Sequence, residues 1–152
     1  MKLDIPGNGN IDIENILLDL NGTLCINGKL VEGVPERISQ LRDQYRLILL
    51  SGNTRGNAQE LADTLGIQFQ ETKTGQAKGE VARQLGTESC AAIGNGLIDL
   101  ELIQAAHLGI VTMQQEGVHT KTLLAADIVV PTINDALDLF IDRQRLIATL
   151  RK

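Results

Sequence analysis

Three apolar runs of the sequence each lead into a group of polar residues that can handle phosphate or a metal ion. The groups belong to the stretches LLDLNGT, LLSGN and AIGNGLID, and they are Asp19, Asn21, Gly22 and Thr23; Ser51, Gly52 and Asn53; and Asn95 and Asp99. A carboxylate can act as a nucleophile or bind a hard cation, and hydroxyl and backbone N–H groups can hold phosphate oxygens. Each residue alone has an ordinary reading as a turn or capping residue. Their joint arrangement at the ends of successive apolar runs indicates a site for phosphate or metal chemistry.

The apolar runs have the length and composition of buried parallel strands, and amphipathic segments separate them. The predicted strands are ENILLDL, RLILLSG, SCAAIGN, GIVTM and ADIVVP, and the predicted helices are VPERISQLRDQY, TRGNAQELADTLG, AKGEVARQLG, LIDLELIQAAHLG and NDALDLFIDRQRLIATLRK. This alternation predicts an α/β fold, with a doubly wound parallel sheet and helices on both faces. Ligands bind such sheets beyond the carboxyl ends of the strands. Lys78, at the start of one predicted helix, is expected to reach the same edge.

Two short segments fall outside this alternation. Ile11 and Ile13 alternate with acidic residues, which favours a half-exposed strand at an antiparallel edge. After the first buried strand, Asn27-Gly28 indicates a tight hairpin in CINGKLVEG. There is room only for this small flap before the next helix. We therefore expect no cap domain over the predicted site.

Composition limits the class of protein. The 152 residues are expected to form one domain, 1–152, whose core is aliphatic because aromatic residues make up only 2% of the chain. A net charge of -5 argues against nucleic-acid binding. Cys25 and Cys90 lack metal-type spacing and are expected to be reduced thiols. No apolar stretch is long enough to span a membrane or act as a signal peptide, so we expect a cytoplasmic protein.

The motifs together resemble those of the haloacid dehalogenase superfamily, and within it the phosphorylation domain of P-type ATPases. LLDLNGTL is similar to the first motif, LILLSGNTRGNAQELADTLGI to the Ser/Thr-Gly-Asp segment, and AAIGNGLIDLELIQAAHLGIVTM with LLAADIVVP to the Gly-Asp-Gly-x-x-Asp segment. The resemblance covers nearly the whole chain from Asn15 onward. The combination of DLNGT with GNG also resembles the soluble P-type ATPase-like proteins, which have no membrane spans.

The resemblance implies a role for each matching residue. Asp19 would be the nucleophile that forms an aspartyl-phosphate and would also bind Mg²⁺, with Asn21 contributing its backbone carbonyl to the metal. Ser51 would bind a phosphoryl oxygen, helped by Gly22, Thr23, Gly52 and Asn53 of the two loops. Lys78 would balance the charge of nucleophile and phosphate, with Lys73 as the weaker candidate. Asn95 and Asp99 would complete the metal motif.

Amides stand where the family's active members have other groups. Asn21 replaces the aspartate that acts as general acid and base in the phosphatases, and losing such help commonly costs ~10²–10⁴-fold in rate. Asn95 replaces a metal-binding aspartate, which is expected to weaken Mg²⁺ binding because hard cations favour anionic oxygen ligands. Asn53 replaces the ATPase aspartate. These departures predict a slow enzyme.

The sequence leaves three readings open. One is a Mg²⁺-dependent phosphatase or phosphotransferase, a phosphoric monoester hydrolase whose open mouth would suit phosphorylated substrates, including macromolecular ones. The second is a catalytically impaired binding or regulatory protein of the same fold. The third, a receiver-like signalling domain, is disfavoured because MKLDIPGNGN lacks the acidic pair expected near the N-terminus. The open mouth also favours a homo-oligomer in which a neighbouring subunit serves as the lid.

Overall fold

The computed structural model describes all residues, 1–152, and its centre is a six-stranded parallel sheet. In the order β10-β9-β8-β3-β6-β7, the strands are Ile128–Val130, Leu108–Thr112, Cys90–Gly94, Asn15–Asp19, Arg46–Ser51 and Gln68–Glu71. Every residue of β3, β8 and β9 is buried, as continuous apolar runs require in a sheet covered on both faces. The predicted α/β fold with a parallel sheet is confirmed.

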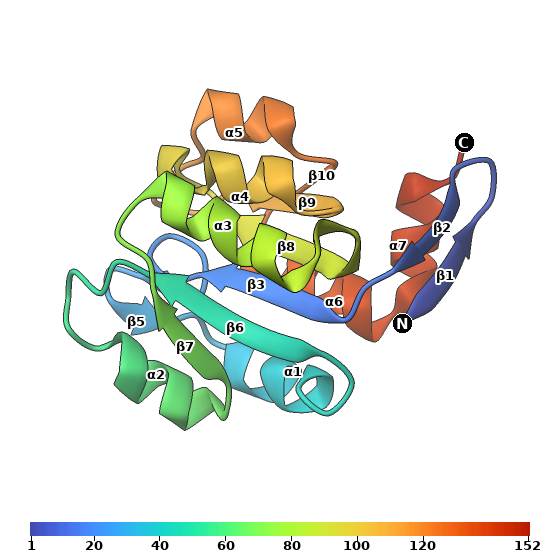
Figure 1. The fold of residues 1–152 in the computed structure, drawn as a ribbon. Coiled ribbons are helices and arrows are strands. Elements are labelled where there is room, and N and C mark those ends of the chain that lie inside the picture. Colours follow the sequence, from blue (N-terminus) through green and yellow to red (C-terminus); the bar gives the residue numbers. More distant parts are fainter.

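Helices cover both faces of this sheet (Figure 1). They are α1 (Val34–Leu41), α2 (Ala58–Leu65), α3 (Gly75–Leu85), α4 (Leu100–Ala105), α5 (Thr120–Ala125), α6 (Ile133–Ile141) and α7 (Arg143–Leu150), with short 3-10 turns η1 (Thr87–Ser89) and η2 (Leu97–Asp99). α3, α4 and α5 lie on one face, and α1, α2 and α6 lie on the other. Gly66 ends α2 in the left-handed conformation, with φ 69°, as its position after the apolar stripe predicts.

The order of the strands places a crevice beside β3. The chain first moves outward from β3 to β6 and β7, and it then returns to β8 on the other side of β3 before continuing to β9 and β10. The connections after β3 and β8 therefore diverge to opposite faces of the sheet. Such a switch point opens a crevice at the carboxyl ends of the strands, where ligands bind in folds of this kind.

The predicted flap after the first buried strand is present. β4 (Cys25–Ile26) pairs antiparallel with β5 (Lys29–Leu30). The turn between them consists of Asn27, with φ 51°, and Gly28, with φ 80°. Two positive φ values are what a tight hairpin turn requires, which explains the Asn-Gly pair. No cap domain accompanies this hairpin.

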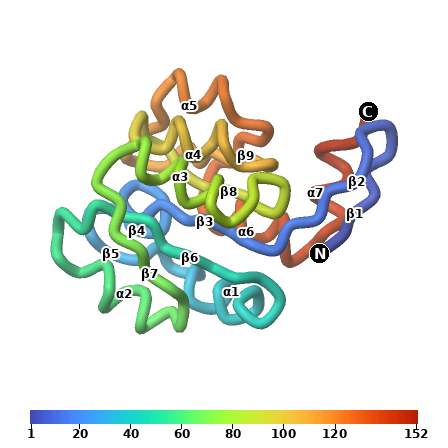
Figure 2. The backbone as a smooth tube through the Cα atoms, in the orientation of Figure 1, coloured from blue at the N-terminus to red at the C-terminus, as the bar shows by residue number.

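The N-terminal segment contains the half-exposed antiparallel strand that its alternation predicts, but this strand is not an edge of the main sheet. It is β2 (Gly9–Asp12), which pairs with β1 (Lys2–Ile5) in a separate two-stranded hairpin. α7 packs against this hairpin, so the two ends of the chain lie side by side (Figure 2). Hydrogen bonds from Asn8 Nδ2 to the Leu150 carbonyl and from the Lys152 N–H to the Pro6 carbonyl join them.

Three further elements differ from the expected ones. The last predicted helix is interrupted at Asp142, which begins α7 by accepting a hydrogen bond from the N–H of Gln144. β7 and α5 were not expected from the apolar pattern, since β7 is an edge strand with no fully buried residue and α5 has only six residues.

No helix is long and apolar enough to cross a membrane.

Candidate functional site

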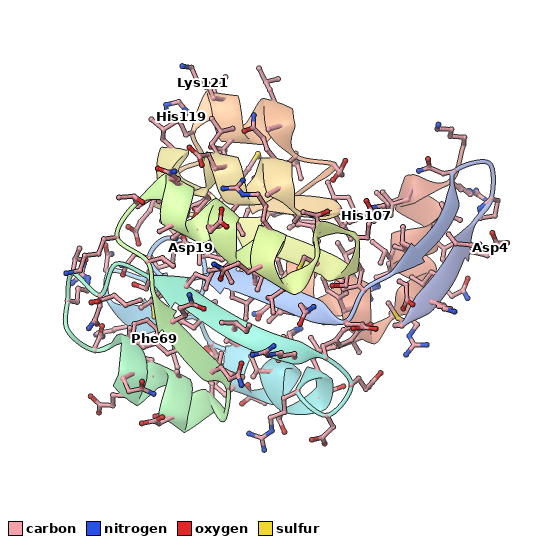
Figure 3. All side chains as sticks on the ribbon, viewed as in Figure 1. Asp4, Asp19, Phe69, His107, His119 and Lys121 are labelled. Carbon is pink, nitrogen blue, oxygen red and sulfur yellow. The ribbon has the colours of Figure 1, made fainter.

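Most of the polar residues singled out in the sequence line one cleft at the carboxyl edge of the sheet. The cleft has a volume of about 370 Å³, and its lining residues are Asp19, Asn21, Ser51, Gly52, Thr54, Lys73, Lys78, Asn95, Gly96, Ile98 and Asp99. Asp19 ends β3, Ser51 ends β6, and Asn95 directly follows β8. The three strand ends meet here because β3 lies between β6 and β8. Figure 3 labels Asp19 within the fold, while His107 and His119 lie away from it.

A buried lysine links two carboxylates at the floor of the cleft. Lys78 Nζ lies 2.6 Å from Asp19 Oδ1 and 2.8 Å from Asp99 Oδ1, and the lysine is only 1% exposed. Thr74 caps α3 by accepting a hydrogen bond from the Ala77 N–H, which fixes the first turn that carries Lys78. One positive charge therefore pairs with two negative ones at the buried floor of the cleft.

This charge arrangement changes the protonation behaviour of the cluster. Burial raises the pKa of Asp19 to about 7, and the negative charge of Asp99 adds to this, while Lys78 and Thr23 oppose it. Burial by itself would lower the pKa of Lys78, but the charges and hydrogen bonds of the two carboxylates outweigh it and raise that pKa. Lys78 therefore keeps its positive charge at neutral pH, while the pKa of Asp19 lies near neutrality.

Asp99 is held from both sides. While Oδ1 accepts from Lys78, Oδ2 accepts from the backbone N–H groups of Asn95 and Gly96, each at 3.0 Å. The side chain is fully buried. Its contacts tie Lys78 to the loop after β8, and they leave no oxygen of Asp99 free of a donor.

Thr23 and Asn95 connect the loop after β3 to the loop after β8. The hydroxyl of Thr23 lies 3.1 Å from both Asp19 Oδ2 and Asn95 Oδ1. Asn95 Nδ2 donates to the Gly117 carbonyl at 3.0 Å. The amide of Asn95 therefore bridges two loops, since a carboxylate there could not donate this second bond. Gly22, with φ 83°, packs so closely on Asn95 that a Cβ would collide with the amide.

Gln114 fixes the backbone of the loop after β3. Its Nε2 donates to the carbonyls of Gly22 and Thr23 at 3.0 and 2.9 Å, and its Oε1 accepts from the Ile133 N–H at 3.1 Å. One side chain thereby joins the loop after β3 to the start of α6. No sequence pattern points to Gln114, because its partners are backbone groups about 20 and 90 residues away.

The predicted phosphate-binding residues divide into two groups. Gly52 lines the cleft, whereas Gly22, Thr23 and Asn53 do not. The Gly22 N–H donates to the Cys25 carbonyl, and Asn53 Oδ1 accepts from the Ala58 N–H at the start of α2. The Asn53 N–H donates to Ser51 Oγ at 3.0 Å, which leaves the Ser51 proton free to be donated into the cleft. These three residues shape the loops around the cleft.

The oxygen atoms near Asp19 include donors suited to a hard cation. Asp19 Oδ2 and Asn95 Oδ1 converge on the same hydroxyl, and the Asn21 carbonyl beside them accepts no hydrogen bond. Oxygen ligands are those that Mg²⁺ prefers, although only one of these three is a carboxylate. No cluster of three or more His, Cys, Asp or Glu side chains is placed to hold a metal. These oxygen atoms are of the chemical type that Mg²⁺ prefers, but together they carry little negative charge.

Four lining residues were not among the predicted site residues. Lys73 was considered only as an alternative to Lys78, and Thr54, Gly96 and Ile98 were not considered. Lys73 follows β7, so the missed strand concealed its place at the same edge of the sheet. Ile98 lies in the turn η2 and is 42% exposed, which a pattern of buried apolar residues does not reveal.

The sequence is similar to one family model and to other known proteins. A family model of haloacid dehalogenase-like hydrolases matches residues 7–107. An uncharacterised protein of Methanocaldococcus jannaschii is 46% identical over 72 residues, which are 47% of this chain and 77% of that protein. A soluble P-type ATPase-like phosphatase of the same organism is 28% identical over 123 residues, which cover 77% of this chain and 45% of the phosphatase.

A solved structure shares the fold. The 3-deoxy-D-manno-octulosonate 8-phosphate phosphatase of Moraxella catarrhalis, in complex with magnesium, phosphate and its sugar, superposes with a TM-score of 0.66 at 18% identity. The match covers 91% of this chain and 94% of that protein. At this identity the likeness concerns the fold alone.

Proposed function

The chain belongs to the haloacid dehalogenase-like hydrolases, and from that membership we propose that it is a phosphatase or phosphotransferase acting on phosphoric monoesters through Asp19. The single observation that carries the proposal is the buried Asp19–Lys78–Asp99 cluster, with 2.6 and 2.8 Å contacts, at the floor of an open cleft. A structural ion pair would bury a balanced charge, whereas this cluster places an excess carboxylate where a substrate can reach it.

The proposed reaction has two displacement steps. A carboxylate oxygen of Asp19 attacks phosphorus, the bond from phosphorus to the ester oxygen breaks, and the leaving oxygen takes its electron pair and then a proton from water. In the second step a water oxygen attacks phosphorus, and the Asp19–phosphorus bond breaks to release phosphate and the free carboxylate. Asn21 lines the cleft but can neither donate nor accept these protons at neutral pH, which makes both steps slow.

The other cleft residues would bind and balance charge. The Ser51 hydroxyl has its proton free for a phosphoryl oxygen, because its own oxygen accepts from Asn53. The positive charge of Lys78 balances the negative charge that passes between Asp19 and the phosphoryl group. Asp99 acts as a positioning residue, since it holds Lys78 and the N–H groups after β8. These contacts would stabilise charge electrostatically at the buried floor of the cleft.

We further propose that Mg²⁺ is the cofactor. The Asp19 carboxylate, the Asn21 carbonyl and the Asn95 amide oxygen would hold it, and Asp99 would support the ligands from behind. When bound, Mg²⁺ supplies positive charge to the phosphoryl oxygens. Thr23 Oγ1 would orient Asp19 Oδ2 and Asn95 Oδ1 together, because it reaches both at 3.1 Å. The mouth has no cap, so the proposed substrates include phosphorylated macromolecules as well as small molecules.

The test is turnover of a broad panel of phosphoesters with Mg²⁺ and with a chelator, together with labelling of the protein by acetyl phosphate. Asp19→Asn should abolish turnover and labelling, and Asn21→Asp should raise the rate on the order of 10²-fold by restoring an acid and base. Asp63→Asn, which changes an exposed carboxylate on α2, is the matched control and should behave as the parent.

Two results would contradict the proposal. Activity that survives Asp19→Asn would belong to a contaminant or to another residue. A protein that neither turns over substrate nor takes a label, yet binds phosphate in the cleft, would instead be the binding or regulatory member of the family that the amides at Asn21 and Asn95 allow.

A further inference from the structure

The cleft contains a second lysine whose charge is not neutralised. Lys78 is shared by two carboxylates at 2.6 and 2.8 Å, whereas Lys73 forms no ion pair with any residue of the chain. Lys73 lines the cleft and is exposed to solvent. Lys73 therefore brings an unpaired positive charge to the wall of the cleft.

The backbone places Lys73 beside the phosphate-binding edge but toward its rim. The Thr72 N–H donates to the Ser51 carbonyl at 2.8 Å, so the chain leaving β7 runs alongside the end of β6. A Cβ built on Gly52 would lie 3.8 Å from the Lys73 Cα. Lys73 therefore starts next to Gly52, one residue beyond Ser51.

Two other residues complete this part of the wall. A Cβ on Gly75 would lie 3.1 Å from the Ile98 carbonyl oxygen, so the start of α3 packs directly on Ile98. Ile98 is the single hydrophobic residue of the cleft lining, and 42% of it is exposed. Thr54, in the loop after β6, adds an exposed hydroxyl. The wall thus combines one cation, one hydrogen-bonding group and one apolar surface.

We propose that Lys73, Thr54 and Ile98 form a subsite for the leaving group of the substrate, and that this group carries a carboxylate on a short apolar stem. The proposal rests on the proposed function and deepens it by naming a substrate class. One lysine balances one carboxylate, the threonine hydroxyl can bind its second oxygen, and Ile98 covers the stem. A substrate without the negative charge would leave Lys73 unpaired.

The experiment compares 3-carboxyphenyl phosphate with phenyl phosphate, which share the ring and the scissile bond. The parent protein should prefer the carboxylated ester by about 3–10-fold in kcat/KM, the range for one solvent-accessible ion pair strengthened by a hydroxyl contact. Lys73→Gln should lower kcat/KM for the carboxylated ester more than for phenyl phosphate and bring the ratio close to one. Lys73→Glu should reverse the preference in favour of 3-(aminomethyl)phenyl phosphate.

Arg55→Gln is the matched control. Arg55 is another exposed cation without an ion pair. It lies against the flap, where its Nη1 is 3.0 Å from the position of a Cβ on Gly28, and it does not line the cleft. Removing it should weaken attraction of both esters alike and leave the ratio unchanged. A ratio that falls equally in both variants would mean general electrostatic attraction and would overturn the subsite.

Binding of the non-hydrolysable pair, 3-carboxyphenylphosphonate and phenylphosphonate, is measured by calorimetry to separate the two proposals. A binding preference lost in Lys73→Gln without any turnover by the parent would support the subsite and contradict the phosphatase. Turnover with no preference between the esters would support the phosphatase and contradict the subsite. Equal losses for both esters in Lys73→Gln would make Lys73 a ligand of the transferred phosphate and overturn the subsite.

Discussion

Asp19, Asp99 and Lys78 form a cluster in which two buried carboxylates share one lysine, so the protein keeps an excess negative charge inside. This arrangement weakens the fold, because burial and the Asp99 charge raise the pKa of Asp19 to about 7. A carboxyl group whose pKa is higher in the folded than in the unfolded protein adds most to the free energy of unfolding at pH values below its unfolded pKa. Its contribution is lost progressively as the pH rises from about 3.8 through 7.

At the residue scale we therefore predict that Asp19→Asn stabilises the protein at pH 8. The free energy of unfolding should rise by roughly 1–3 kcal/mol in metal-free buffer, because each unit of pKa corresponds to ~1.4 kcal/mol. The gain should shrink toward pH 5, where Asp19 is already protonated. Urea unfolding at the two pH values measures this. A variant less stable than the parent at pH 8 would mean that the Lys78 ion pair outweighs the excess charge.

At the scale of elements, the loop after β9 controls the geometry of the site although it contributes no lining residue. Gln114 holds the carbonyls of Gly22 and Thr23 and the first N–H of α6, and the Gly117 carbonyl accepts from Asn95. The same loop reaches the flap, where the Asn27 N–H donates to Glu116 Oε2 at 3.3 Å. The loop thus joins three elements whose positions decide where Asp19 points.

We predict that Gln114→Ala lowers kcat on phosphoesters about tenfold or more while KM changes little. Loss of the two carbonyl contacts frees the turn that carries Thr23, and misplaced reacting groups lose rate more than binding. Gln115→Ala is the matched control, because the neighbouring side chain is exposed and makes no hydrogen bond. Steady-state kinetics of both variants make the comparison. A larger KM with unchanged kcat would place Gln114 in substrate binding instead.

At the scale of the whole molecule, the two ends of the chain close the fold. The β1–β2 hairpin places Leu3, Ile5 and Ile11 in the same apolar core as Ile38 of α1 and Phe140 of α6. The core on the α1 face is therefore built from both ends and the middle of the sequence. We propose that residues 1–152 form one domain on this basis.

The corresponding prediction is a single cooperative unfolding transition. Because the terminal hairpin shares its core with the main sheet, it should not melt separately, and the calorimetric and van't Hoff enthalpies should agree. Scanning calorimetry measures both values. Two transitions, with β1, β2 and α7 unfolding first, would divide the chain into two units.

The sequence alone determined the parallel α/β sheet, the flap turn and the identity of the residues at three strand ends. These features depend on local information: continuous apolar runs, an Asn-Gly pair that accepts positive φ, and polar residues directly after each run. β7 and the break at Asp142 escaped because an exposed edge strand and a cap inside an amphipathic stretch leave no such pattern.

Only the tertiary structure decided what the site residues touch. Asp19 and Lys78 are 59 positions apart in the chain, and Asn95 and Gly117 are 22 apart, so no spacing rule relates them. Packing of α3 against η2 brings Asp99 against Lys78, and packing of β7 beside β6 brings Lys73 to the rim of the cleft. Hydrogen bonds and charge interactions act over a few ångströms in space, and the fold alone sets those distances.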